Sequence, residues 1–254
     1  MKGKVWLVGA GPGDISLITV KGMECIKHAD VLVYDRLVNP ELLTFAPKHC
    51  ELIDVGKKCD HHPIPQDQIN QILADHAKAG KKVVRLKSGD PYVFGRGGEE
   101  AQLLVEQQVP FEVVPGVTSA IGGLTCAGIP VTHRDHASSF HVVTGHLRAD
   151  KETDPINWKA LAELDGTIVI LMGVANLANI AQELMQYGKP ADTPVGIVMW
   201  ASRDKQRVVT ATLETIVDVA KANDVKPPAL IVIGSVVNLQ QMLDFSAFIS
   251  DPAQ

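Results

Sequence analysis

The segment RLKSGDPYVFGRGGEE, residues 85–100, places the strongest constraint on how this chain can fold. A mostly apolar run at residues 82–86 leads into it, and a helical pattern at residues 99–107 leads out of it. Four glycines, one proline and charges of both signs lie between them, which is typical of a loop that joins a strand to a helix. A solvated surface turn would account for any single Gly-Asp-Pro, but a loop of this length in a compact domain is usually functional. We therefore predict a strand, a functional loop and a helix start, in that order.

Short apolar runs alternate with helical patterns along the whole chain, which predicts an α/β fold. We expect strands at residues 5–8, 30–34, 50–55, 83–86, 111–114, 140–144, 167–171, 194–200, 206–212 and 227–234. We expect helices at residues 17–29, 66–79, 99–107, 176–185 and 213–222, and one more after the glycine turn at residues 115–120. The polar segment 148–155 is expected to be a surface loop. With 254 residues, the chain is long enough for one large domain or two small ones.

The composition argues against several classes of protein. A net charge of −5 and a pI near 6.0 argue against nucleic-acid binding. No apolar run reaches the roughly 18 residues that cross a membrane, and the first residues lack the pattern of a signal peptide. The four cysteines form no CxxC pair, which argues against a zinc or iron–sulfur site and favours a reducing cytoplasm. No spacing around Cys59, His61 and His62 puts three ligands on one face, so we expect no metal.

The positive charges are unevenly distributed along the chain. All nine histidines lie before residue 150. The same part of the chain contains Arg36, Lys57, Lys58, Arg85, Lys87, Arg96, Arg134 and Arg148. A chain that is acidic overall can still concentrate positive potential in one cleft. Scattered surface charge is the alternative, and the composition does not decide between the two.

A second glycine loop, GAGPGD at residues 9–14, follows the first expected strand and invites comparison with a dinucleotide-binding loop. The third glycine of that motif would fall at position 14, where the chain has Asp14. A carboxylate there suits a helix cap and would repel a pyrophosphate, and Pro12 removes one of the amide donors. The loop therefore suits a neutral or cationic ligand better. Asp35 follows the next strand, at the end where open α/β sheets place their ligand groups.

Several motifs, taken in order, resemble those of the uroporphyrinogen-III C-methyltransferases, tetrapyrrole methylases that use S-adenosylmethionine (SAM). The resemblance covers roughly residues 3–240. It includes VGAGPGD at 8–14, YDRL at 34–37, VGK at 55–57, the segment 85–100, VPGVTSA at 114–120, GIP at 128–130, THR at 132–134, TGH at 144–146 and PA at 228–229. Ordered motifs at consistent spacing are far more specific than a single glycine turn.

The resemblance implies a class III methyltransferase fold, in which two α/β domains hold SAM in the cleft between them. The expected domains are residues 1–116 and 117–254. The family also implies a homodimer in the cytoplasm that acts on a small-molecule tetrapyrrole, with no nucleic acid, membrane or metal. Siroheme synthases carry an additional N-terminal dehydrogenase and ferrochelatase domain. Because the chain begins at the methylase, we expect neither of those activities.

Carried over by motif, the resemblance assigns SAM contacts to ten residues. They are Pro12, Ser88, Gly89, Asp90, Val93, Thr118, Ser119, Met172, Ala201 and Ala229. Ser88 and Ala201 stand where relatives often have glycine, so main-chain contacts are expected there. Thr118 and Ser119 could instead cap the helix that follows them.

The resemblance offers two competing sets of residues for proton transfer. Asp35 and Lys57 match positions with acid–base roles in the fused synthases. Arg96, Glu99 and Arg134 match positions linked to substrate binding or proton removal in the single-domain enzymes. The sequence does not decide which set supplies the base.

Arginine is normally a poor base, because its pKa is above about 12. We therefore expect Arg36, Arg96 and Arg134 to bind carboxylates of the substrate, and Asp35 or Glu99 to transfer protons. Uroporphyrinogen is a polycarboxylate, which would explain a locally basic cleft in a chain that is acidic overall.

The implied reaction methylates uroporphyrinogen III at C2 and C7 and gives precorrin-2 and S-adenosylhomocysteine. An electron-rich pyrrole carbon attacks the methyl group in line, and the cationic adduct then loses a proton to a nearby base. Precorrin-2 can supply siroheme, cobalamin or haem d1. Two alternatives are a later precorrin C-methyltransferase of the same fold and a NAD-binding dehydrogenase, the latter suggested by residues 9–13.

Overall fold

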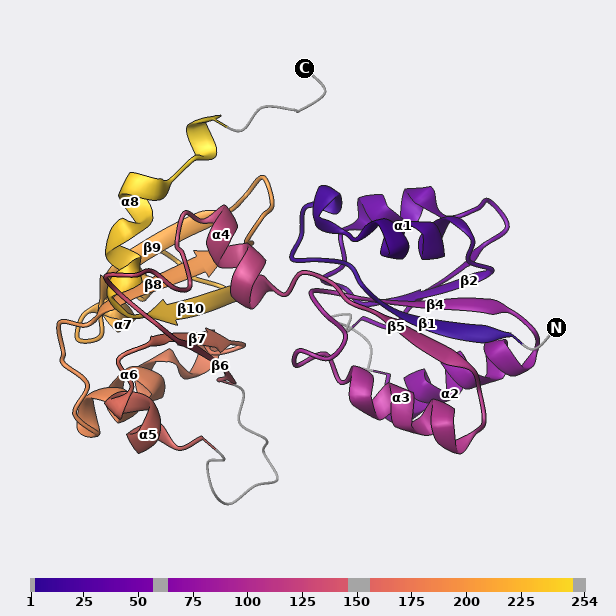
Figure 1. Ribbon diagram of the computed structural model, residues 1–254, viewed down its shortest axis with the longest axis horizontal. Coiled ribbons are helices and arrows are strands. Elements are labelled where there is room, and N and C mark those ends of the chain that lie inside the picture. Colours follow the sequence, from indigo (N-terminus) through magenta and orange to yellow (C-terminus); the bar gives the residue numbers. More distant parts are fainter. Residues whose placement is uncertain (1–2, 57–63, 146–155, 249–254) are drawn as a thin grey trace. The chain divides into compact units, whose positions relative to one another are not determined.

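The computed structural model describes residues 3–56, 64–145 and 156–248. The chain divides into two compact units, Met1–Thr118 and Ser119–Gln254, and each unit contains one five-stranded sheet (Figure 1). The domain boundary expected at residues 116 and 117 stays a prediction. Within the described residues, no helix has the length and apolar character needed to span a lipid bilayer.

The first unit is built on a parallel sheet with the strand order β3-β2-β4-β1-β5. Its strands are β1 (Lys4–Gly9), β2 (Val31–Tyr34), β3 (Glu51–Asp54), β4 (Lys82–Lys87) and β5 (Phe111–Val114). Its helices are η1 (Ile15–Leu17), α1 (Val20–Lys27), η2 (Pro40–Phe45), α2 (Gln66–Lys78) and α3 (Gly97–Glu106). In Figure 1, α1 covers one face of the sheet, and α2 and α3 cover the other.

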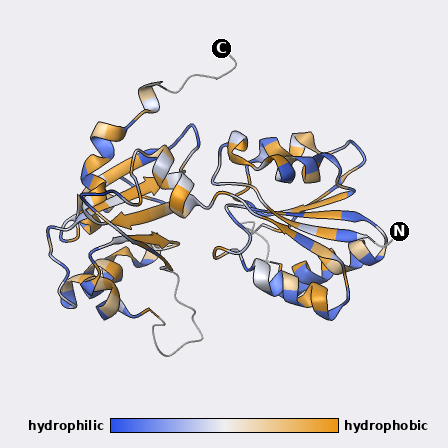
Figure 2. Cartoon of the chain, in the orientation of Figure 1, coloured by the Kyte–Doolittle hydropathy of each residue, from blue (hydrophilic) through white to orange (hydrophobic). Residues whose placement is uncertain are grey.

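Both faces of the first sheet are packed, which explains why β1 and β2 are mostly apolar. On one face, Leu73 of α2 and Leu104 of α3 belong to the same buried cluster as Leu7 of β1. On the other face, Ile26 of α1 packs with Leu32 of β2. Figure 2 shows the long apolar stretches of the strands and the mixed character of the helices around them. The central strands are therefore covered on both faces, whereas the edge strand β3 is largely exposed.

The chain leaves the ends of β1 and β4 in opposite directions along the sheet. After β1 it crosses over β4 to form β2, and after β4 it crosses over β1 to form β5. In open α/β sheets, ligands bind beside the carboxyl ends of two strands whose connections diverge in this way. The topology therefore directs attention to the loops after β1 and β4, residues 10–14 and 88–96.

The second unit contains a mixed sheet with the order β6-β7-β10-β8-β9, in which only β6 and β7 are parallel neighbours. Its strands are β6 (Phe140–Thr144), β7 (Thr167–Leu171), β8 (Pro194–Met199), β9 (Arg207–Thr212) and β10 (Ala229–Ile233). Its helices are η3 (Ser119–Gly123), α4 (Leu124–Cys126), α5 (Trp158–Glu163), η4 (Val174–Asn176), α6 (Leu177–Gln186), α7 (Ile216–Ala222), η5 (Ser235–Leu239), α8 (Gln240–Leu243) and η6 (Ser246–Phe248). Helices α5, α6 and α7 contribute to one buried cluster, and α4 and η5 to another.

The α/β fold and each expected strand are confirmed, with strand ends that shift by one or two residues. The helix expected at residues 17–29 is instead two pieces. Asp14 Oδ1 accepts a hydrogen bond from Ser16 N and caps η1, and Thr19 Oγ1 accepts one from Gly22 N and caps α1. Ile18 between them is extended, so one continuous helix cannot form. The surface loop expected at residues 148–155 lies outside the described residues.

Candidate functional site

Three glycines bring the carboxyl ends of β1, β4 and β5 into close contact. A Cβ atom on Gly9 would lie 2.5 Å from Gly116 Cα and 2.7 Å from Gly89 O. No side chain fits at such distances from backbone atoms, so the approach of these three strand ends requires glycine. The main chains of neighbouring loops therefore meet at one point on the edge of the first sheet.

Two hydrogen bonds join the loop after β1 to the loop after β4. Gly11 N donates to Gly89 O at 3.2 Å, and Gly89 N donates to Gly11 O at 2.8 Å. Their φ angles are +78° and +69°, a conformation that glycine adopts without penalty. This bridge lies where the two connections diverge, so paired main chain forms the base of the candidate site.

Asp90 connects the loop after β4 to the end of β5. Its Oδ1 accepts a hydrogen bond from Tyr92 N at 2.8 Å, and its Oδ2 accepts one from Gly116 N at 3.0 Å. Charge-assisted bonds of this kind are about twice as strong as neutral ones. The carboxylate therefore has a fixed orientation within its own loop.

The SAM contacts expected in the first unit gather on these two loops. Pro12 lies in the loop after β1, and Ser88, Gly89, Asp90 and Val93 lie in the loop after β4. Gly89 is buried, whereas the other four are partly exposed. Residues from two separate motifs are therefore brought together by the parallel pairing of β1 with β4.

A buried cluster of charges lies between β4, α3 and the end of β2. Arg85 donates through Nε to Glu100 Oε1 at 3.0 Å and through Nη2 to Asp35 Oδ1 at 2.6 Å. Lys87 Nζ and Gln66 Nε2 donate to the same Glu100 oxygen at 2.9 Å and 3.2 Å. The side chains of Arg85, Lys87 and Glu100 are at most 3% exposed, whereas that of Asp35 is 33% exposed. Of the two cations and two carboxylates in this cluster, Asp35 is the one that reaches solvent.

Burial affects the two basic members of this cluster differently. The pKa of Lys87 is lowered, chiefly by burial and also by the nearby charge of Arg85. Burial likewise opposes the charge of Arg85, but the charges and hydrogen bonds of Asp35 and Glu100 together raise its pKa. Two of the basic residues that could have lined an open cleft are therefore buried inside the first unit, where they are paired with carboxylates.

The sequence pattern assigned no role to Glu100 or to its contacts, although it carried a usable signal. Arg85 and Lys87 are two positions apart in a strand and so point to the same face. Two basic side chains on one face of an apolar parallel strand need buried acidic partners. An acid in the first turn of the next helix is a natural partner, because it is also favoured by the helix dipole.

Arg96 and Glu99 form an exposed pair at the start of α3. Arg96 Nε donates to Glu99 Oε1 at 2.9 Å, and Arg96 Nη2 donates to Glu99 Oε2 at 2.7 Å. The hydrogen bond to Glu99 is the main reason that the pKa of Arg96 is raised. Arg96 is 56% exposed and permanently charged, which suits an anion-binding role better than that of a base.

The end of β2 and the end of β3 are packed together beside Asp35. A Cβ atom on Gly56 would lie 2.6 Å from Arg36 Cβ. Arg36 is exposed, so its guanidinium is available at the same edge of the sheet as Asp35. Lys57, the other expected acid–base residue of this pair of motifs, lies outside the described residues.

The SAM contacts expected in the second unit lie at one edge of the mixed sheet. Met172 follows the end of β7, and Ala201 lies two residues after the end of β8. Ala229 is the first residue of β10, which is antiparallel to both of those strands. The start of β10 therefore lies beside the ends of β7 and β8, and this pairing gathers the three residues.

Strained backbone conformations accompany the expected contacts in both units. Met172, Trp200 and Ser202 have positive φ angles of 56°, 49° and 59°. In the first unit, Phe94 and Arg96 have φ angles of 54° and 58°. Each such residue costs about 1–3 kcal/mol, and this strain is often found at ligand sites. The loops after β4, β7 and β8 therefore combine strain with expected ligand contacts.

Ser119 and Thr118 lie where the two units join in sequence. Ser119 opens η3, which is a π-helical turn, a rare form that is frequent at functional sites. A Cβ atom on Gly123, at the end of η3, would lie 2.9 Å from Ala201 Cβ. The π turn thus packs beside the strained loop after β8. Thr118 is the last residue of the first unit.

Arg134 lies in a tight turn of the second unit. His133 N donates to Ala137 O at 3.0 Å, and Ala137 N donates to His133 O at 2.9 Å. The rings of His133 and His136 lie 5.0 Å apart, centroid to centroid. The turn therefore carries an exposed arginine, a residue type that binds carboxylates well.

The loops of the first unit suit SAM better than a dinucleotide. Pro12 has no N–H to offer a phosphate, and Asp14 occupies Ser16 N at a helix start that a phosphate would need. The groups that remain are main-chain atoms, the Ser88 hydroxyl and the Asp90 carboxylate. Such neutral and acidic groups fit a cationic sulfonium.

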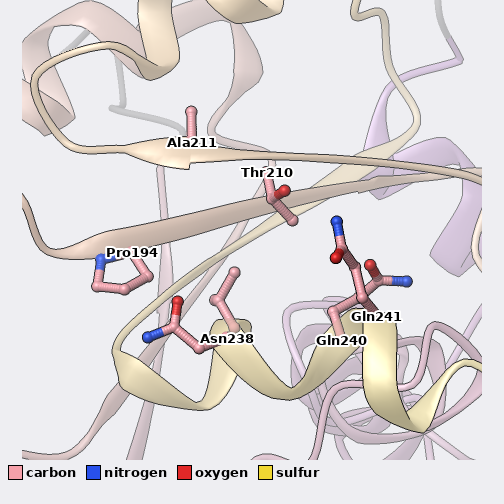
Figure 3. A pocket seen from close by; sticks show the side chains of 7 residues that line it. Pro194, Thr210, Ala211, Asn238, Gln240 and Gln241 are labelled. Atoms are coloured by element: carbon pink, nitrogen blue, oxygen red, sulfur yellow. The ribbon is translucent and has the colours of Figure 1, made fainter.

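A separate hollow in the second unit has a volume of about 260 Å³. Its walls come from β8, β9 and the helices η5 and α8 (Figure 3). The lining residues are Pro194, Thr210, Ala211, Val237, Asn238, Gln240 and Gln241. None of the expected site residues lines this hollow.

Among the described residues, no group of three His, Cys, Asp or Glu side chains could hold a metal ion. Cys59, His61 and His62 lie outside the described residues.

Comparisons with known proteins agree with the motifs. The profile of the family described as Tetrapyrrole (Corrin/Porphyrin) Methylases matches residues 4–217. The chain is 51% identical to the uroporphyrinogen-III C-methyltransferase of Priestia megaterium, and the match covers 93% of this chain and 99% of that protein. It is 54% identical to the protein of the same name from Methanocaldococcus jannaschii, with 94% and 98% covered.

A solved structure gives the same result for the fold. Uroporphyrin-III C-methyl transferase from Thermus thermophilus, complexed with S-adenyl homocysteine, is 44% identical to this chain with a TM-score of 0.79. The match covers 93% of this chain and 99% of the other. The expected family is therefore confirmed by sequence and by structure: the chain belongs to the tetrapyrrole methylase family.

Proposed function

We propose that this chain is a SAM-dependent uroporphyrinogen-III C-methyltransferase, which methylates C2 and C7 and gives precorrin-2. The observation that carries this proposal is identity above 50% over nearly the whole chain to two proteins of that name. The glycine-lined loops after β1 and β4 support it, because they suit a cationic donor and carry the motifs of the family.

The residues of the chain divide the work of the reaction. SAM, when bound, supplies the methyl group. From the family motifs, we propose that Pro12, Ser88 and Asp90 of the first unit and Met172 and Ala201 of the second contact the donor. Strained and glycine-bridged loops position a ligand well because they are rigid before it arrives.

Three further contacts are proposed at residues with small side chains. We propose Thr118, Ser119 and Ala229 as contacts to SAM on the basis of the family motifs. Gly89 and Val93 complete the set in the first unit. Ala229 begins β10, Ser119 opens the π turn η3, and Gly89 and Val93 lie in the loop after β4, which supports these four assignments.

Three arginines are proposed to bind the carboxylates of the substrate. Arg36, Arg96 and Arg134 are all exposed. Arginine matches the planar geometry of a carboxylate with two parallel hydrogen bonds. The existing Arg96–Glu99 pair already has this geometry, which shows that the Arg96 guanidinium can present two parallel donors to a carboxylate.

Asp35 is proposed to remove the proton that the methylated ring must lose. Both carboxylate oxygens of Glu99 accept hydrogen bonds from Arg96, so Glu99 is engaged in that pair. Asp35 is partly exposed, and among the described residues its carboxylate accepts one hydrogen bond, at Oδ1. A general base needs a lone pair within reach of the substrate. Lys57 remains a possible second acid–base group from its motif alone.

The experiment is anaerobic incubation of the chain with uroporphyrinogen III and methyl-labelled SAM. We expect two labelled methyl groups in each tetrapyrrole product. An absence of label in the tetrapyrrole would contradict the proposal. Label incorporated into precorrin-2 and not into uroporphyrinogen III would instead favour a later precorrin C-methyltransferase.

The dehydrogenase alternative is tested by calorimetry. We expect binding of S-adenosylhomocysteine and none of NADH. The reverse result would support a dinucleotide site in the loop at residues 9–14.

We also propose that the enzyme is a homodimer in the cytoplasm, as the family resemblance implies. Size-exclusion chromatography with light scattering should give twice the chain mass of 27.3 kDa. A monomer at micromolar concentration would contradict the dimer, and fractionation of cells tests the compartment.

A further inference from the structure

Asp35 depends on a neighbouring side chain for its orientation. Its Oδ1 accepts the 2.6 Å hydrogen bond from Arg85 Nη2. Its main-chain N–H donates to Leu86 O at 3.4 Å, which is long for such a bond. Asp35 follows the last residue of β2 and so is outside the regular ladder of the sheet. The guanidinium therefore contributes most to where this carboxylate points.

Arg85 is itself fixed at its other end. Its Nε donates to Glu100 Oε1 at 3.0 Å, so one rigid planar group spans the two carboxylates. Glu100 is 0% exposed and belongs to the first turn of α3. At 2% exposure, Arg85 cannot touch a substrate, and any effect on the reaction must act through Asp35.

The same carboxylate also supports the loop that contains Arg96. Lys87 Nζ donates to Glu100 Oε1 at 2.9 Å. The Lys87 chain runs close to the loop, since a Cβ atom on Gly95 would lie 3.3 Å from Lys87 Cε. Glu100 thus connects the proposed base at the end of β2 with the proposed arginine clamp after β4.

This cluster is a costly way to stabilise a fold. Buried ion pairs rarely improve stability over apolar side chains of similar size. Glu100 Oε2 is buried without a hydrogen-bond partner among the described residues. A buried, incompletely satisfied network argues for a role other than stability.

We infer that Arg85 is a positioning residue, which is anchored by Glu100 and sets the orientation of the Asp35 carboxylate toward the substrate. This inference rests on the proposed function and on Asp35 as the base. It assigns to the buried part of the segment 85–100 a function distinct from donor binding.

The test is a double-mutant cycle with Arg85→Lys and Asp35→Asn. Lysine keeps the buried charge, but a single ammonium cannot replace two nitrogens that donate to separate carboxylates. We expect Arg85→Lys to lower kcat about 100-fold, the scale of a 1 Å misplacement. The KM for uroporphyrinogen III and the Kd of S-adenosylhomocysteine should change less than about threefold, because neither ligand touches Arg85.

The double variant separates positioning from general damage. If Arg85 acts through Asp35, the kcat of the double variant should equal that of Asp35→Asn alone. Multiplied losses would overturn the inference, and so would a normal kcat for either single variant. Lys189→Met is the matched control, because it removes a buried basic residue of the second unit that donates only to main-chain carbonyls. We expect it to lower the Tm and leave kcat unchanged.

A crystal structure of Arg85→Lys provides a readout that does not depend on turnover. We expect the Asp35 carboxylate to rotate away from its position while the β2 backbone stays in place. An unmoved carboxylate would overturn the inference even if the wild-type chain methylates uroporphyrinogen III. Conversely, a wild-type chain without methyltransferase activity would refute the proposed function, while this structure would still report on the positioning. Glu100→Asp withdraws the anchor by one methylene and should give the same kinetic pattern if Arg85→Lys does not fold.

Discussion

The two sheets differ in how they accommodate buried charge. In the first unit, the charged side chains buried between β4 and α3 share Glu100 as a common partner and end at Asp35. In the second unit, the buried charged residue of the described part is Lys189. It donates to Ala162 O at 3.3 Å and to Leu164 O at 2.7 Å, near the end of α5.

The difference is one of coupling. Lys189 donates to main-chain carbonyls near the end of one helix. After its loss, a water molecule can donate to those carbonyls in its place. In the first cluster Arg85 and Lys87 share the Glu100 carboxylate, so the loss of Glu100 takes from Lys87 the acidic hydrogen-bond partner that the described residues give it. The buried lysine of the second unit therefore caps the end of a helix. The buried charges of the first unit instead orient the Asp35 carboxylate at the edge of the sheet.

The largest expected effect on stability comes from Glu100→Gln, which tests the difference between the two units most directly. Removing the shared carboxylate leaves Arg85 and Lys87 with one acidic partner between them. We expect a loss of about 3–5 kcal/mol in the free energy of unfolding, as for a broken buried pair. Denaturation in urea measures it, with Lys189→Met as the comparison. A smaller loss for Glu100→Gln than for Lys189→Met would refute the coupling.

The next largest effect concerns the close contact among Gly9, Gly89 and Gly116. Gly9→Ala places a Cβ against the main chain of Gly116, which cannot move without shifting β5. We expect a loss of about 1–3 kcal/mol, together with weaker binding of S-adenosylhomocysteine. In the second unit, Gly173→Ala meets only isoleucine side chains, which can adjust, so its loss should be smaller.

Gly98→Ala is the matched control for the glycine substitutions. A Cβ there would meet nothing within 4 Å, and the residue lies in α3. We expect a gain of up to about 1 kcal/mol, because alanine favours a helix over glycine. Equal losses for Gly9→Ala and Gly98→Ala would show that the close approach of the strands is not what matters.

A third prediction compares one residue from each unit. Asp90→Ala should weaken the binding of S-adenosylhomocysteine about 10- to 100-fold, since it removes charge-assisted bonds that order the loop after β4. Arg134→Ala should raise the KM for uroporphyrinogen III and leave the affinity for S-adenosylhomocysteine nearly unchanged. Calorimetry and steady-state kinetics measure the two. Loss of both affinities at Arg134 would contradict its assignment as a clamp.

The smallest effect is a pH dependence at the opposite end of β5. Hydrogen bonds from Lys21 and then Lys4 lower the pKa of Glu112 to about 2, from an ordinary value of 4.5. Because the pKa of this carboxylate is lower in the folded state than in the unfolded state, its contribution to the free energy of unfolding is present above pH 4.5. That contribution is lost as the pH falls through about 2. Exposed pairs contribute only about 0–1 kcal/mol. Glu112→Gln should therefore reduce stability slightly at pH 7 and by less at pH 2, as thermal unfolding can check.

The strands could be predicted from the sequence because both sheets are buried and their strands form short, nearly continuous apolar runs. The motifs also placed Pro12 and Asp90 correctly at the ends of strands that the structure shows to be neighbours. The roles of the site residues stay predictions, since they rest on the family resemblance.

Other features could not be read in this way. The break at Ile18 depends on competition between two capping residues, Asp14 and Thr19, and a helical pattern does not reveal it. The link from Arg85 to Asp35 joins residues 50 positions apart, so it becomes visible only when the strand order is known. The spacing of apolar residues along the sequence indicates which face of an element is buried. It does not indicate which side chains contact one another there.

The bond pair between Gly11 and Gly89 has a consequence for how the donor would be recognised. The two loops are joined by hydrogen bonds between their own main chains, so they need no rearrangement when a ligand binds. Binding therefore loses little conformational entropy at this point. Specificity at that point is then a property of backbone shape, and the side chains around it are free to vary. Under the family resemblance, which leads us to expect glycine at the position of Ser88, a small side chain there would leave recognition of the donor unchanged.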